Sequence, residues 1–143
     1  MITFENVIHD RIINSLEVLL KAEFPSFRIN YDEHSAGQSF LILPQSDNIE
    51  SLHSTGQNRT YSILIGYRLK DGGKYTKNGI FKALTAVSER VKRLVDNNVG
   101  YSPSSSYKWH NAQIESIEYI QDEEDSQYYY ANLIFSCESM EVR

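Results

Sequence analysis

The segment Arg59–Lys70 constrains the fold of this 143-residue chain most, because its apolar side chains alternate with a mainly polar set. Such alternation is typical of a β-strand that buries one face and exposes the other. The apolar positions are Tyr61, Ile63, Ile65, Tyr67 and Leu69. The chain must therefore build a sheet with one strongly apolar face that other elements cover.

Two amphipathic helices are predicted to cover this face. The first begins at a cap on Thr3 and continues to about Glu23, where Pro25 enforces the end. The second runs from about Lys77 to Asn97, with apolar side chains three or four residues apart. Both helices have the apolar stripe that packing against a sheet requires.

Two valines of the first helix, Val7 and Val18, project from a different side than its main apolar stripe. One interpretation is a helix buried on two sides, which is the commoner arrangement. The other is a contact between this side of the helix and another subunit. The sequence leaves both open.

Short strands are predicted at Phe27–Tyr31 and Phe40–Leu43, joined as a hairpin by the polar turn Asp32–Gln38. Pro44 is expected to end the second strand, because proline cannot donate a backbone hydrogen bond to a sheet. The following segment, Gln45–Asn58, is predicted to be a polar loop. A loop of that length in a compact domain is usually functional or mobile.

A final hairpin is predicted from Ala112–Gln121 and Gln127–Ser139, with the acidic corner Asp122–Asp125 between them. Alternation divides the last strand into two faces. The face expected to meet the helices carries Tyr129, Ala131, Leu133, Phe135 and Cys137, whereas Tyr128 and Tyr130 lie opposite.

The element order is therefore helix, three strands, helix, two strands. It predicts an α+β fold in one domain, with a single mixed or antiparallel sheet of about five strands covered by two main helices.

The residues indicate no catalytic centre. The four histidines fall on separate elements, and no nucleophile or zinc-hydrolase motif accompanies them. The cluster Asp32-Glu33-His34 is more typical of a solvated turn than of a metal site. The segment Gly72-Gly73-Lys74-Tyr75-Thr76 lacks the full phosphate-loop pattern and is interpreted as a turn. We expect no enzyme activity, metal or cofactor.

The formal net charge of −5 disfavours a general nucleic-acid-binding role, since such proteins usually carry a basic excess. No apolar run approaches the length that spans a bilayer, so no membrane partner is expected. The single cysteine, Cys137, is predicted to be a small buried hydrophobe, compatible with a reducing cytosol.

Charge is divided between two segments. From 74 to 96 basic residues dominate, and from 115 to 141 there are eight acids and no lysine or arginine. Opposite charges on one chain favour docking of the basic surface of one copy against the acidic surface of another. The charge pattern alone is explained equally well by two ordinary solvated faces on a monomer. The basic residues are Lys74, Lys77, Lys82, Arg90, Lys92 and Arg93, and the acids are Glu115, Glu118, Asp122, Glu123, Glu124, Asp125, Glu138 and Glu141.

This layout resembles the tail terminator and tail-completion proteins of long-tailed bacteriophages. These are small α/β proteins that oligomerise at the head-proximal end of the tail, typically as hexameric rings. The resemblance rests on element order, length and the lack of an active site rather than on a signature motif. It covers Thr3–Glu23, Arg59–Lys70, Lys77–Asn97 and the final hairpin.

The resemblance implies a structural virion protein, assembled in the host cytoplasm, that stops tube growth and joins tail to head. Its expected partners are further copies of itself in a hexameric ring, the tail tube protein, and a head completion or neck protein, with double-stranded DNA passing through. Candidates for the subunit interface or channel are Asp122, Glu123, Glu124, Asp125, Lys82, Arg90, Lys92, Arg93, Tyr128 and Tyr130, and candidates for axial contacts are Asp47, Ile49, Leu52 and His53.

Three alternatives stay open. The neighbouring neck or adaptor role fits a chain of similar size and composition. A ferredoxin-like ligand-binding domain would show a deep apolar pocket with convergent polar groups, and a nucleic-acid-binding module would bind DNA through the basic segment with steep salt dependence.

Overall fold

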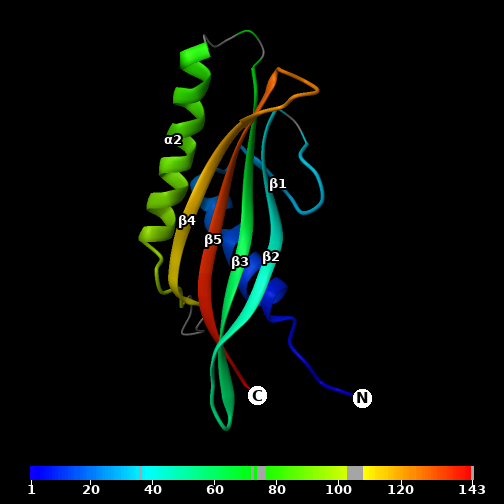
Figure 1. Cartoon of the computed structure of the whole chain (residues 1–143), viewed down its shortest axis with the longest axis vertical. Coiled ribbons are helices and arrows are strands. Elements are labelled where there is room, and N and C mark those ends of the chain that lie inside the picture. Colours follow the sequence, from blue (N-terminus) through cyan, green and yellow to red (C-terminus); the bar gives the residue numbers. More distant parts are fainter. Residues whose placement is uncertain (36, 72, 74–76, 103–107, 143) are drawn as a thin grey trace.

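The computed structural model describes residues 1–143 except 36, 72, 74–76, 103–107 and 143, and it contains one five-stranded mixed sheet with two helices (Figure 1). The strand order is β1-β2-β3-β5-β4. All neighbours are antiparallel except β1 and β2, which are parallel. This confirms the predicted α+β class. The strands are β1 (Arg28–Asn30), β2 (Gln38–Leu52), β3 (Gly56–Lys70), β4 (His110–Gln121) and β5 (Tyr128–Val142).

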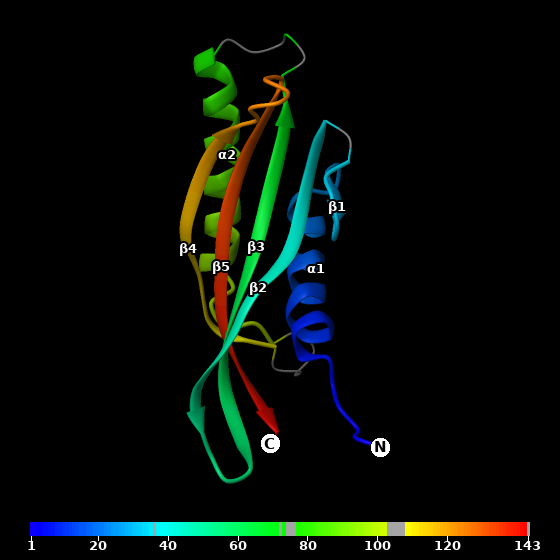
Figure 2. The same ribbon diagram turned by 45° about the vertical axis from the view of Figure 1, so that its right-hand side comes forward.

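Both helices lie on the same face of the sheet (Figures 1 and 2). Beneath them the alternating side chains of β3 and β5 are buried as predicted. Phe40 and Ile42 extend this layer onto β2. The helices contribute Ile12, Leu16, Leu20, Ile80, Leu84, Val91 and Val95, all of which are buried.

The first helix begins later than predicted. A π-helical segment, η1 (Val7–Ile13), leads into α1 (Asn14–Glu23). The cap is Asn6 rather than Thr3, because the Asn6 side chain accepts a hydrogen bond from the His9 backbone N–H at 3.4 Å. The predicted end is confirmed, with Phe24 as the C-terminal cap before Pro25.

The second helix, α2 (Lys77–Asp96), matches its prediction closely. Its last turn is closed by Asn97, whose backbone N–H donates to the Arg93 carbonyl at 3.0 Å, and by Asn98, whose side chain donates to the Leu94 carbonyl at 2.8 Å. Of the preceding turn, Gly73 is described and has a φ of +85°. The rest of the predicted turn, Gly72 and 74–76, lies outside the described residues.

The predicted hairpin between the first two strands is wrong, because β1 runs parallel to β2. The cause is aromatic packing just before β1. The Phe27 ring lies 5.2 Å from Phe24, 5.7 Å from Phe40 and 5.7 Å from Tyr67, measured between centroids. This cluster places Ile29 beside Phe40 in the ladder. After β1 the chain must therefore run back to the starting end of β1 before it begins β2 in the same direction.

The predicted strand end at Pro44 and the predicted loop Gln45–Asn58 are also wrong. β2 continues through Pro44 to Leu52 with a register shift after Pro44, and it pairs with β3 to form a long hairpin. Proline is tolerated there because β1 pairs with β2 only as far as Leu41, which leaves Pro44 on a sheet edge. We call the distal part of this hairpin, residues 46–58, the arm; it projects beyond both helices (Figure 1).

The aromatic cluster predicts a large effect of Phe27→Ala. Removing a packed ring from between three aromatic neighbours should lower the free energy of unfolding by roughly 2–4 kcal/mol. Urea unfolding monitored by circular dichroism measures this. The matched control is Phe4→Ala, since the Phe4 side chain is 80% exposed. Equal effects of the two substitutions would contradict the role given to the cluster.

Candidate assembly surface

The acidic corner is partly an internal structure. One Asp122 carboxylate oxygen accepts the backbone N–H groups of Glu124 at 2.9 Å and Asp125 at 3.3 Å, and the other accepts the Tyr130 hydroxyl at 3.0 Å. These hydrogen bonds lower the pKa of Asp122. Asp125 accepts the Gln127 backbone N–H at 3.2 Å. Two of the four carboxylates thus close the turn.

Tyr128 and Tyr130 lie on the face opposite the helices, as alternation predicts, and both are half-buried. The Arg68 guanidinium lies 4.4 Å from the centroid of the Tyr128 ring. The Tyr130 ring lies 5.6 Å from the His34 ring. Contacts within the chain therefore hold both rings.

His34 comes from the turn between β1 and β2, which folds over this same sheet face. Its Nδ1 lies 2.7 Å from the hydroxyl of the buried Ser39. Burial, assisted by the positive charge of Arg68, lowers the pKa of His34 to about 4. His34 therefore serves as a neutral packing residue between Ser39 and Tyr130.

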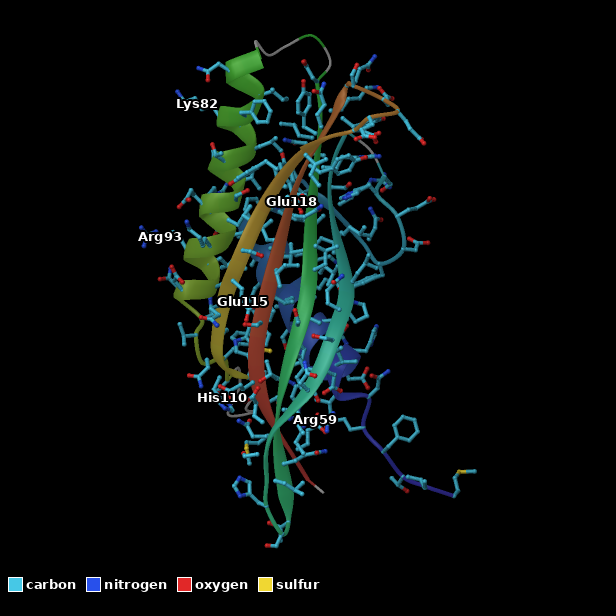
Figure 3. All side chains as sticks on the ribbon, in the orientation of Figure 1. Arg59, Lys82, Arg93, His110, Glu115 and Glu118 are labelled. Atoms are coloured by element: carbon cyan, nitrogen blue, oxygen red, sulfur yellow. The ribbon has the colours of Figure 1, made fainter. Side chains whose placement is uncertain are left out.

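The basic residues of α2 fall into two groups. Arg90 donates to the Glu23 carboxylate at 2.8 Å and lies 4.4 Å from the Phe24 ring centroid, so it joins the two helices. Lys92 pairs with Glu89 at 2.7 Å. Lys82 and Arg93 are exposed and point away from the sheet (Figure 3). Lys74 and the side chain of Lys77 lie outside the described part of the chain.

The predicted axial residues all lie on the arm. Asp47 accepts a hydrogen bond from Arg59 Nε at 2.6 Å, which ties the two strands together. Ile49 and Leu52 are 50% and 52% exposed. His53 is exposed near the tip, with Nε2 lying 3.4 Å from the Ser51 hydroxyl. The arm thus presents two large apolar side chains to solvent.

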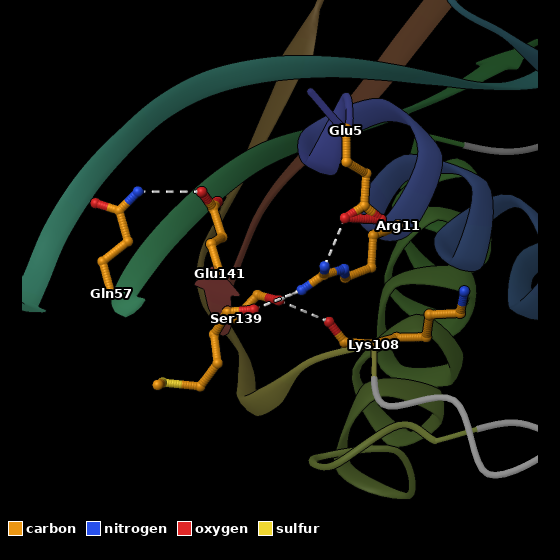
Figure 4. A network of polar contacts seen from close by, with 7 residues as sticks. Glu5, Arg11, Gln57, Lys108, Ser139 and Glu141 are labelled. Carbon is orange, nitrogen blue, oxygen red and sulfur yellow. Dashed lines mark hydrogen bonds and ion pairs between the residues drawn. The ribbon is translucent and has the colours of Figure 1, made fainter. Parts of the chain in front are cut away.

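A polar network braces the base of the arm against the first helix (Figure 4). Arg11 of η1 donates to the Ser139 hydroxyl at 2.8 Å and to the Met140 carbonyl at 2.7 Å, both on β5. It also pairs with Glu5 at 2.7 Å. The Ser139 hydroxyl in turn donates to the Lys108 carbonyl at 3.0 Å. The arm therefore emerges from a fixed base.

Sequence reasoning missed an exposed surface on the open face of the sheet, where Leu43, Leu64 and Ile134 form a half-buried apolar row across three strands. Beside this row lies a recess of about 500 Å³ lined by residues that include Glu50, Glu115 and Glu138. The sequence does contain a signal for this surface. In each strand, the residues that alternate with the core-facing ones include large apolar side chains.

No group of three or more histidine, cysteine, aspartate or glutamate side chains in the described part of the chain could hold a metal ion. Cys137 is buried, and burial raises the pKa of its thiol. Neither described helix is long and apolar enough to cross a membrane.

Comparison with protein-family models and with curated proteins gave no match to this chain.

The environment of His34 predicts a pH-dependent stability. In the unfolded chain the His34 imidazole is protonated below about pH 6.5, whereas in the folded chain it stays neutral down to about pH 4. Stability should therefore fall by roughly 1–3 kcal/mol as the pH drops from 6.5 to 4. Urea unfolding at several pH values measures this, and His34→Gln should flatten that part of the profile. An unchanged profile in the variant would contradict the assignment.

Proposed function

We propose that this chain is a structural subunit of the tail-terminator type, which assembles with copies of itself into a ring at the end of a phage tail tube. In this role it stops tube growth and joins the tail to a head completion or neck protein. The order of helices and strands supports the proposal.

The observation that carries the proposal is the arm. A hairpin with a braced base projects beyond the helix-covered body and exposes Ile49 and Leu52. Exposed apolar side chains that gather on one projecting element mark a surface for another protein. A ring subunit needs such an element to reach the ring above or below it.

The remaining surfaces fit the other tasks of a ring subunit. The sheet and two helices supply a rigid core, and exposed charges of opposite sign supply a side contact between copies. Val7 packs against the core, whereas Val18 is 58% exposed on α1, so only Val18 is left for the predicted subunit contact. Glu123 and Glu124 are exposed on the acidic corner and would repel DNA phosphates if they line the channel.

The arm provides the test of this function. In a phage that encodes the chain, inactivating its gene should give tails of excess and irregular length, which the wild-type chain restores to uniform length. The variant Ile49→Ser/Leu52→Ser should still fold and form rings, yet fail to restore tail length, because it lacks the apolar contacts of the arm. Electron microscopy of the particles measures tail length.

Ser51→Ala is the matched control, since Ser51 is exposed on the same hairpin, and it should restore uniform tails. Two results would contradict the proposal. Tails of normal length that fail to join heads would indicate a neck protein instead, and full activity of the Ile49→Ser/Leu52→Ser variant would remove the role of the arm.

A further inference from the structure

Neither described helix covers one face of the sheet, because both lie on the other face (Figure 2). The apolar row Leu43, Leu64 and Ile134 crosses this open face at one level of the ladder. These side chains are partly buried by their neighbours and partly open to solvent. The open face therefore offers an apolar centre for a contact.

Carboxylates lie beside this centre. Glu115 and Glu118 on β4 are exposed and lie along the open sheet (Figure 3). In the adjoining recess, Glu50 accepts the Thr60 hydroxyl at 2.8 Å, and Glu138 accepts the Asn58 side-chain amide at 2.8 Å. None of these four carboxylates forms an ion pair with another described residue. The surface therefore carries an uncompensated negative charge.

The outer side of α2 has the complementary character. Lys82, Ala86 and Arg93 are exposed and lie on one stripe of the helix, because they are separated by four and seven residues. Glu89 and Asp96 fall on the same stripe. Lys92 neutralises Glu89 at 2.7 Å, and Asp96 lies beyond Arg93 at the end of the helix. Lys82 and Arg93 form no ion pair within the described part of the chain. The stripe is thus basic at two points with a small apolar residue between them.

The two surfaces are also of similar length. Lys82 and Arg93 are separated by about 16 Å along the helix axis at the usual rise per residue. Glu118 lies opposite Asn132, and Glu138 follows on β5 about 20 Å further along the strand. A helix lying along the sheet can therefore bring both basic side chains to carboxylates while Ala86 faces the apolar row.

We propose that the open sheet face of one copy, along β4 and its recess, receives the outer stripe of α2 from a second copy. Glu118 and Glu138 are the acidic contacts at the two ends, Glu115 lies between them, and Lys82 and Arg93 are the basic contacts. This assignment rests on the proposed ring function and replaces the acidic corner with β4 as the partner of the basic helix. Because the two surfaces differ, the contact is head-to-tail and repeats around a ring.

Paired charge reversals test the contact. The variant Glu115→Lys/Glu118→Lys makes the sheet face basic, and Lys82→Glu/Arg93→Glu makes the helix stripe acidic. Each alone should raise the dissociation constant between copies at least tenfold in sedimentation equilibrium at low salt, because like charges then meet. An equimolar mixture of the two variants should assemble again, since every contact in an alternating ring pairs opposite charges.

The matched control is Glu123→Lys/Glu124→Lys, which makes the same change in net charge on the acidic corner. It should assemble like the wild type, and it should not rescue Lys82→Glu/Arg93→Glu. All these side chains are exposed, and circular dichroism checks that each variant folds.

Three results would overturn the assignment. They are unchanged assembly of the β4 variant, an equal loss in the corner control, or a mixture that stays dissociated. If these occur while the wild type forms rings, the proposed function stands and only this contact is wrong. A wild-type chain that never associates would contradict both.

Discussion

The pairing of β3 with β5 is the constraint on which the rest of the structure depends. The two strands pair from Gly56 with Val142 to Lys70 with Tyr128. Fifteen residues of strand extend about 50 Å, whereas the twenty residues of α2 extend only about 30 Å. The helices therefore cover one face of the ladder only in part. The uncovered length becomes the arm, and the uncovered face is the surface that we propose for a second copy.

The sequence predicted the helices and strands that bury one face and expose the other. It did not predict the arm, which is solvated on both faces, or the direction of β1. The apolar stripe of α2 predicted the bounds of this helix to within one residue, and the alternation of Tyr61 to Leu69 predicted β3 apart from its first three residues. The arm could not be predicted in this way, because a strand solvated on both faces shows no hydrophobic period. The direction of β1 depends on the packing of Phe27 against Tyr67, residues forty positions apart, which no local pattern contains.

The charged residues show a similar division. The runs of acids and bases were visible in the sequence, but their roles depend on where each side chain points. Asp122 closes its own turn, and Arg90 joins α1 to α2, so both side chains already make contacts within the chain. Glu118 lies on β4 and Lys82 on the outer side of α2, and both residues are exposed (Figure 3). Hence the isolated charges on β4 and α2 are better candidates for an interface than the dense acidic corner.

These features together describe a subunit with a rigid core, two different lateral surfaces and a projecting arm. We propose that such a chain completes its buried surface in an assembly of copies. The most direct test is the mass of the purified protein in solution, measured together with electron microscope images. We expect closed rings, with six copies as the expected number and all arms projecting in the same direction. A monomer at every concentration, both alone and in the presence of tail tubes, would contradict the ring proposal.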